Sequence, residues 1–169
     1  MNLKVITYPA NSPIKLDLVK DYLRIDYGEE DALIQGMINA AISHTENFTR
    51  RSLSIKTYEL TLNKYKNRVK LPKPPFVSLD SVKDENLQPI EHVVLEEDGT
   101  AFVVFENSFE KAIITYQSGY EEMPKPIEQA ILMLVSHFYE NRELAIVGTS
   151  VVKLPFSVEA LLYPYKGWF

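Results

Sequence analysis

The stretch that decides the fold is "LDLVKDYLRIDYGEEDALIQGMINAAISHTENFTRRSL", residues 16–53, because it predicts two successive amphipathic helices. The first helix follows Ser12 and Pro13, a good N-cap and a good first helical residue. The second opens with the acidic run Glu29–Asp31, which suits the N-terminal end of a helix dipole. Its apolar side chains, together with Thr45, recur at helical spacing, at Leu33, Ile34, Met37, Ile38, Ala41, Ile42, Thr45 and Phe48. A short connection separates the two, so we predict an antiparallel helix hairpin within residues 12–51.

The middle of the chain, about residues 53–117, changes to the alternating pattern of β-strands. Lys56–Leu62 alternates in period two, and a second alternating run extends over Lys64–Leu71. Further strand candidates are "FVSLDSV", "IEHVVLEE", "AFVVFE" and "KAIITYQ". Asp98-Gly99 is the strongest hairpin signal, and "LPKPPF" (residues 71–76) excludes a helix. We expect an inserted antiparallel β-meander of roughly four to six short strands.

The last third returns to helix over residues 124–163. Pro124 and Pro126 flank the start of a strongly apolar helix, and Ser157 is placed to cap a short helix that Pro164 ends. The sequence therefore predicts a single α+β domain over residues 1–169. Its antiparallel helical core combines the N-terminal hairpin with the C-terminal helices and carries the β insertion.

Composition narrows the class of protein. The chain has 169 residues, 46% hydrophobic and 24% charged, which is typical of a globular domain with a real core. It has no cysteine, which excludes disulfides and thiolate chemistry. The longest apolar run, Ala130–Val135, is far shorter than the ~20 residues that span a bilayer, so we expect no membrane segment. We also expect no signal peptide. A net charge of -5 argues against a dedicated nucleic-acid binder.

The helix "PIEQAILMLVSHFYENRE", residues 126–143, ends in a polar cluster that raises the question of catalysis. His137 and Glu140 have a spacing that metal ligands sometimes use, but a second pair of this kind is missing from the sequence. Nucleophile and phosphate-loop motifs are also missing. We therefore predict a non-enzymatic protein with no catalytic residue, metal ligand or cofactor. A small metal-dependent hydrolase using His137 and Glu140 is the less favoured alternative.

Charge is unevenly distributed along the chain. A basic block covers residues 50–73 and an acidic block covers residues 84–122, and such blocks influence the choice of partners. The candidate interaction residues are Lys64, Lys66, Arg68 and Lys70 from the first block and Glu96, Glu97 and Asp98 from the second. If the basic residues share one strand, they form a stripe that faces phosphates or an acidic neighbour. Alternatively, lysines protect an edge strand from aggregation, or Asn67 interrupts the run with a turn.

The C-terminal tail, residues 163–169, is unusually aromatic. Its sequence "YPYKGWF" contains Tyr163, Tyr165, Trp168 and Phe169, residue types that often anchor interfaces. Two interpretations stay open: the tail folds back on its own core, or it docks on a partner.

The order of these segments resembles phage and prophage head–tail connector proteins, also called adaptor or head-completion proteins. The resemblance rests on "YLRID" (Tyr22–Asp26), the acidic turn Glu29–Asp31, and Glu46 followed by Arg51 at the end of the long helix. The later segments "LPKPPFVSLDSV", "ITYQSGYEEMPKPIEQAILMLVSHFYENRE" and "LPFSVEALLYPYK" are similar to the longer branch of the family, which has a β insertion.

This resemblance implies an assembly role in the neck of a virion, for a protein made in the cytoplasm of the bacterial host. Family members form a homo-oligomeric ring beneath the portal protein after DNA packaging, extend the DNA channel and present a surface to tail-side proteins. Duplex DNA then passes through without sequence-specific binding. The resemblance brings no catalytic residue. Two rival interpretations are another neck or tail-completion protein and a regulatory binding module of a bacterial operon.

Overall fold

The computed structural model describes residues 1–9, 11–64, 66–142 and 155–167. The chain divides into two compact units, a β unit of Met1–Asn11 with Arg51–Glu122, and a helical unit of Ser12–Arg50 with Met123–Phe169. The predicted α+β class is confirmed by these helices and antiparallel sheets. Among the described helices, none is long and apolar enough to cross a membrane.

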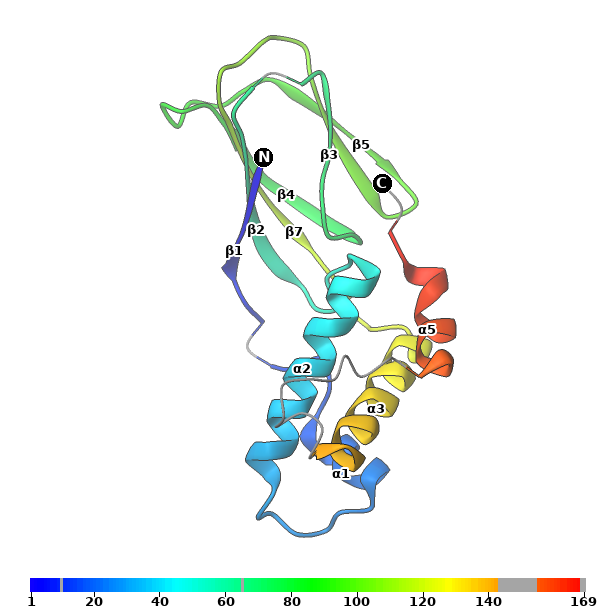
Figure 1. The fold of residues 1–169 in the computed structure, drawn as a ribbon. Helices are drawn as coiled ribbons and strands as arrows, with labels where there is room; N and C mark the ends of the chain where they lie inside the picture. Colours follow the sequence, from blue (N-terminus) through cyan, green and yellow to red (C-terminus); the bar gives the residue numbers. More distant parts are fainter. Residues whose placement is uncertain (10, 65, 143–154, 168–169) are drawn as a thin grey trace. The chain divides into compact units, whose positions relative to one another are not determined.

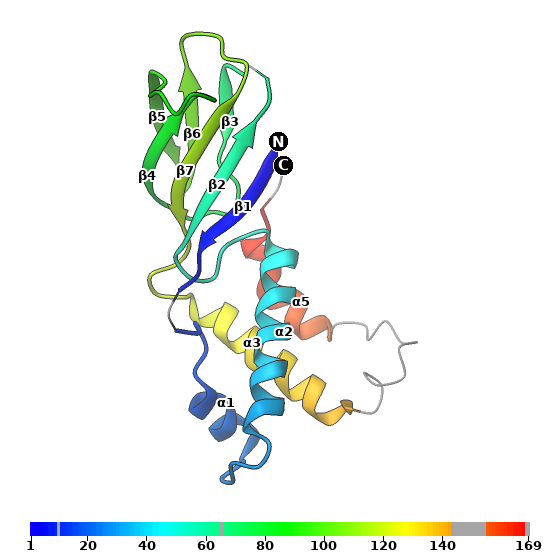
Figure 2. The same cartoon turned by 90° about the vertical axis from the view of Figure 1, so that its left-hand side faces the viewer.

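The β unit contains two antiparallel sheets, which Figure 2 shows one behind the other. The four-stranded sheet has the order β1-β2-β7-β4 and the three-stranded sheet has the order β3-β6-β5. The strands are β1 (Asn2–Thr7), β2 (Lys56–Leu62), β3 (Arg68–Lys70), β4 (Phe76–Lys83), β5 (His92–Glu97), β6 (Thr100–Phe105) and β7 (Ala112–Ser118).

One hydrophobic core joins the two sheets. Alternate residues of β2, β6 and β7 are buried, as expected for strands that turn one side toward a core. Their buried side chains form one cluster with residues of β3 and β4. The rings of Tyr58 and Tyr116 stack there with centroids 5.6 Å apart. Each hydroxyl has a partner, because Tyr58 donates to Ser52 Oγ and Tyr116 donates to the carbonyl of Pro72, both at 2.9 Å.

The expected β-meander is wrong in its topology. A meander pairs each strand with the next one along the chain, whereas β7 lies between β2 and β4, and β6 lies between β3 and β5. Strand β1 was not predicted from the sequence, although Leu3 and Val5 alternate there with exposed neighbours. These pairings join segments far apart in sequence, and local periodicity carries no information about which strands pair.

Turn residues predicted the structure more reliably than strand periodicity predicted the topology. Asp98 and Gly99 connect β5 to β6 as predicted, with φ angles of 49° and 68°. Two successive positive φ angles are what a tight hairpin turn of the right twist requires. The "LPKPPF" segment, as expected, separates β3 from β4 without a helix.

The helical unit consists of α1 (Leu16–Leu23), α2 (Asp31–Thr49), α3 (Lys125–Glu140), α5 (Phe156–Leu162) and the 3-10 helix η1 (Tyr163–Tyr165). Helices α2 and α3 pack against each other, and α5 packs on α3 (Figure 1). The apolar residues of α2 that are fully buried, Ile34, Ile38 and Ala41, belong to the predicted helical stripe. The apolar face of α3 is buried as well, at Ile127, Ala130, Ile131, Leu134 and Val135.

Two helix starts differ from the prediction. Helix α1 begins at Leu16, because Ser12 Oγ accepts from the amide of Ile14 at 3.4 Å and forms a local turn instead of a cap. Helix α5 follows Pro155, so that Ser157 lies inside the helix. Serine competes for nearby backbone groups in turns as readily as in caps, which limits its value as a start signal.

Candidate interaction surfaces

The predicted basic row does not lie on one strand. Only Arg68 and Lys70 belong to β3, where both point away from the core while Val69 points into it. Lys64 and Lys66 precede the strand in irregular structure, so the row over Lys64–Leu71 is interrupted, as the alternative turn near Asn67 had anticipated. A continuous stripe of four bases at strand spacing is therefore not formed.

Arg68 connects the two charge blocks within one chain. Its guanidinium donates to Glu97 Oε1 at 3.0 Å, and it also lies over the Phe102 ring, 3.8 Å from the centroid. Glu96 and Glu97 end β5, and Asp98 begins the following turn. The pair of Arg68 and Glu97 is exposed, and exposed pairs stabilise by only about 0–1 kcal/mol. Its consequence is electrostatic, because the two blocks partly neutralise each other within the subunit.

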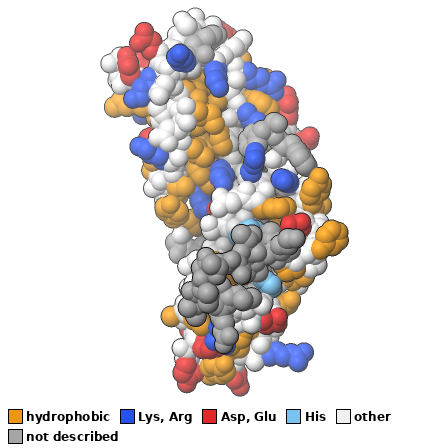
Figure 3. Space-filling model, in the orientation of Figure 1, with side chains coloured by type: hydrophobic (Ala, Val, Ile, Leu, Met, Phe, Trp, Pro, Cys, Tyr) orange, Lys and Arg blue, Asp and Glu red, His pale blue; other side chains and the backbone are white. Residues whose placement is uncertain are grey.

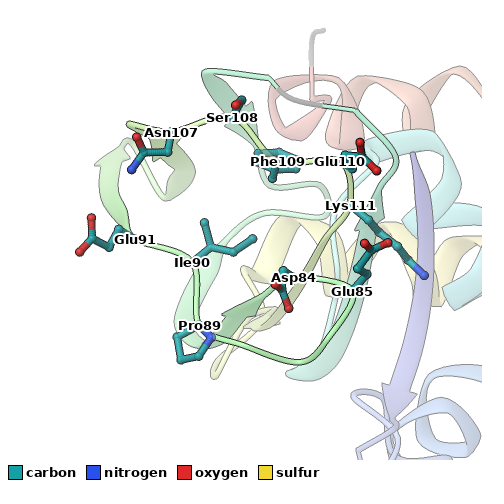
Figure 4. Close-up of a pocket in the computed structure, with 10 residues that line it drawn as sticks. All are labelled: Asp84, Glu85, Pro89, Ile90, Glu91, Asn107, Ser108, Phe109, Glu110 and Lys111. Atoms are coloured by element: carbon teal, nitrogen blue, oxygen red, sulfur yellow. The ribbon is translucent and has the colours of Figure 1, made fainter.

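The acidic block also borders two pockets of the β unit. The first, of about 380 Å³, is drawn in Figure 4 and is lined by four acids and Lys111 around apolar Pro89, Ile90 and Phe109. Its acids do not converge, because Glu91 lies on the opposite side from Glu110 and Lys111 (Figure 4). The second pocket, of about 430 Å³, includes Lys64 together with Glu85 and Glu110. Bases and acids distant in sequence are thus close in space.

The space-filling view agrees with this mixture of charges. On the face drawn in Figure 3, basic side chains over the strands are interspersed with apolar and uncharged ones. They do not form an unbroken stripe on that face.

His137 and Glu140 have separate partners near the end of α3. Glu140 Oε1 accepts from Ser136 Oγ at 3.2 Å, and His137 Nδ1 lies 3.3 Å from the side-chain nitrogen of Asn141. Within the described residues, no group of three His, Asp or Glu side chains has a geometry that would hold a metal ion. The other acid of this polar cluster, Glu143, lies outside those residues.

The polar end of α3 is held instead by Glu30, a role that was not predicted from the sequence. Glu30, just before α2, accepts from Tyr139 Oη at 2.5 Å and from Arg142 Nη1 at 2.5 Å. The Arg142 guanidinium also stacks on the Tyr139 ring, 4.2 Å from its centroid. These donors hold the pKa of the Glu30 carboxyl below its ordinary value, and Glu30 raises the pKa of Arg142. The cluster therefore ties the end of α3 to the start of α2.

Comparison with known proteins gives the family. The family model of head completion proteins matches residues 14–163, which is most of the chain. The chain belongs to the head completion protein family. This confirms the resemblance found in the sequence. Among curated protein sequences, none matches the chain significantly.

The fold is shared with solved structures of gene transfer agent (GTA) particles. A chain in the neck of an empty GTA particle, computed with C6 symmetry, has a TM-score of 0.79 at 20% identity. A chain in the virion of a native GTA particle has a TM-score of 0.81 at 20% identity. A chain in the neck of a native GTA particle, computed with C12 symmetry, has a TM-score of 0.80 at 18% identity. In each case the match covers 100% of this chain and 97% of the other. At these identities the likeness establishes the fold of this head completion protein.

The aromatic tail of this head completion protein is described only up to Gly167. Its Tyr163 is exposed by 56%, and Tyr165 is half-buried. Lys166 lies over the ring of Phe48 on α2, 5.1 Å from its centroid, and the Gly167 amide donates to the carbonyl of Thr49 at 2.8 Å. The chain is thus attached to the end of α2 immediately before Trp168 and Phe169, which lie outside the described residues.

Proposed function

We propose that this protein is a structural connector in the neck of a phage or prophage particle. In this proposal it oligomerises into a ring beneath the portal protein, extends the DNA channel and joins the head to the tail. The observation that carries the proposal is the head completion family match over residues 14–163. The protein would be synthesised in the host cytoplasm and would act in the virion, without enzymatic activity.

The shared fold supports this proposal. The similar chains lie in neck or virion structures of GTA particles, two of them treated with sixfold or twelvefold symmetry. A ring of copies needs heterologous contacts, in which one surface of a subunit meets a different surface of the next. In the ring, the helical unit would act as the antiparallel helical core, with α1 and α2 as its hairpin.

The proposed partners follow from the same role. Portal protein would bind one side of the ring and tail-side neck proteins the other, with the aromatic tail as a candidate docking segment for one of them. Duplex DNA would pass through the channel without sequence-specific binding. A net charge of -5 suits a conduit, because like charge discourages the duplex from adhering.

The test is negative-stain microscopy with a mass measurement, on the purified protein alone and mixed with its cognate portal protein. Closed rings alone, or rings stacked coaxially on the portal, are the expected result. A monomer that still joins the portal would retain the connector role and make ring formation dependent on the portal. A monomer that ignores the portal would refute the proposal.

A second candidate function is that of another neck or tail-completion protein. The same GTA structures support it, because they include a whole virion as well as necks. Immunogold labelling of intact particles separates the two, since a connector lies directly beneath the portal and a tail-completion protein lies farther along the tail.

A further inference from the structure

The two outer faces of the β unit have opposite chemistry. The side chains of the four-stranded sheet that point away from the core are mostly polar, and include Thr57, Glu59 and Thr61 on β2 and Thr115 and Gln117 on β7. This is the normal arrangement for an antiparallel sheet with one face in water.

The outer face of the three-stranded sheet has an apolar centre instead. On β6, Ala101, Val103 and Phe105 point into the core, so Phe102 and Val104 point outward. The register places Leu95 opposite Phe102 and Val93 opposite Val104. We call these four residues, Val93, Leu95, Phe102 and Val104, the apolar sheet face. Val93 is 50% exposed and Leu95 is 43% exposed. Phe102 and Val104 are half-buried, and the Arg68 guanidinium lies over the Phe102 ring. Adjacent exposed apolar side chains, here Val93 and Leu95, are a mark of an interaction surface.

Basic residues border the apolar sheet face along β3. The register places Arg68 opposite Val104 and Lys70 opposite Phe102, on the same outward side. Glu97 also lies on this side, but its carboxylate is engaged by Arg68. The surface therefore consists of an apolar centre with a basic edge. It would suit a partner surface whose apolar side chains are flanked by acidic ones.

The helical unit carries such a surface on α1. Leu18 and Tyr22 are exposed by 38% and 41%, and the exposed acids Asp17 and Asp21 immediately precede them. Both pairs have i, i+4 spacing, so they form adjacent rows on one side of the helix. We call these four residues the α1 face. Between Lys15 and Glu29 the exposed charged residues are Asp17, Asp21, Asp26 and Glu29 against Lys15 and Arg24, so this end of the unit is acidic.

The spacings of the two surfaces also agree. Side chains four residues apart on a helix are separated by about 6 Å along the axis. Side chains two residues apart on an antiparallel strand are separated by about 6.8 Å. Leu18 and Tyr22 can therefore lie along Val93 and Leu95, with the acids directed toward the basic edge.

We propose that the apolar sheet face of one copy binds the α1 face of the next copy. This inference rests on the proposed ring and names the contact that builds it. The contact is heterologous: each copy uses its sheet face for one neighbour and its α1 face for the other, and repeated contacts of this kind close a ring. It also differs from the predicted basic row, because Lys64 and Lys66 lie outside β3 and only Arg68 and Lys70 border the apolar sheet face.

The chain has no cysteine, which allows a direct test by disulfide trapping in the full-length protein. Leu18→Cys protein is mixed with an affinity-tagged Leu95→Cys protein of different mass. The mixture is oxidised, once with portal protein present and once without it. The matched control replaces Leu95→Cys by Thr61→Cys, which places the thiol on the polar outer face of the four-stranded sheet. A combination of Tyr22→Cys with Val93→Cys repeats the test one step along the contact.

We expect about tenfold more mixed dimer from the sheet-face combinations than from the control, because groups held at a contact reach millimolar effective concentrations. As a second measurement, Leu95→Glu should lose ring formation whereas Thr61→Glu should retain it, since only the first puts a carboxylate against the α1 acids. Far-UV circular dichroism of both variants establishes that each is folded.

The outcomes separate this contact from the proposed function. Rings that form without trapping above the control, or that survive Leu95→Glu, would overturn the contact and leave the connector role intact. Trapping of Leu95→Cys on portal protein, or on a cysteine placed at Trp168 of another copy, would assign the face to that occupant instead. Failure of the wild-type protein to assemble with itself or with the portal would refute the connector role and the contact together.

Discussion

Replacement of Gly119 by alanine should strongly destabilise the β unit. Gly119 directly follows β7 and has a φ of 139°, a backbone angle that residues with a side chain rarely adopt. A Cβ atom there would lie 2.0 Å from the carbonyl oxygen of Ser54 and 2.7 Å from the amide nitrogen of Ile55. Both are backbone atoms, so no side-chain rotation can relieve the overlap. The Gly119 amide also donates to the carbonyl of Pro75 at 2.8 Å, which holds the position fixed.

The expected loss combines two costs. A residue held in an unfavourable backbone conformation costs about 1–3 kcal/mol. Forcing extra atoms into a packed site costs another 1–3 kcal/mol or so. Gly119→Ala should therefore lower the free energy of unfolding by about 2–6 kcal/mol, a large part of the 5–15 kcal/mol or so that typical domains have.

Urea denaturation followed by far-UV circular dichroism measures this loss, and Gly36→Ala is the matched control. Gly36 is exposed on α2, and a Cβ there would meet nothing within 4 Å. That substitution should stabilise the protein by about 0.5–1 kcal/mol, because glycine is costly in a helix interior. A Gly119→Ala protein within about 1 kcal/mol of the wild type would show that the turn after β7 can relax, and would refute the reasoning.

Three further predictions concern the cluster around Glu30, the core of the β unit and the domain organisation. Because the pKa of Glu30 is lowered in the fold, its carboxylate adds stability at pH values above the ordinary 4.5, and this stability is lost as pH falls through the lower folded value. Glu30→Gln should flatten the acid side of a plot of unfolding free energy against pH, and an unchanged slope would contradict the role of the cluster. Tyr116→Phe should cost about 1–3 kcal/mol in urea denaturation, because the carbonyl of Pro72 loses its donor, and a neutral effect would mean that water replaces it. The single domain expected from the sequence should unfold in one calorimetric transition, whereas two separate transitions would make the two units independent domains.

The sequence predicted those elements whose signals are local. Helices α2 and α3 have apolar side chains at helical spacing over their whole length, and that pattern admits few alternatives. The Asp98-Gly99 turn was predicted for the same reason, since few residue pairs tolerate its backbone angles. Strand order was not predictable, because β7 pairs with β2, which is far earlier in the chain: Tyr58 lies opposite Tyr116, 58 residues away.

The candidate sites were harder to predict than the strand order, because they also depend on contacts between residues far apart in the sequence. Glu30 is 109 residues from Tyr139 and 112 residues from Arg142, and no local pattern connects them. The basic row was visible as a sequence pattern, but its meaning depended on whether Lys64 and Lys66 share a strand with Arg68. They do not, and the pairing of Arg68 with Glu97 depends on the β3-β6-β5 sheet order, which the sequence could not supply.

The apolar sheet face did leave a signal in the sequence. The strands "HVVLEE" and "TAFVVF" contain consecutive apolar residues, at Val93–Leu95 and Ala101–Phe105, instead of a strict alternation. A run of this kind puts apolar side chains on both sides of a strand, which is typical of sheets covered on both faces. Among the described residues of the β unit, the core packs against one side of these strands. A sheet face with an apolar centre leaves a place for a partner surface, and in the proposed contact the acidic, apolar α1 face of a second copy takes that place.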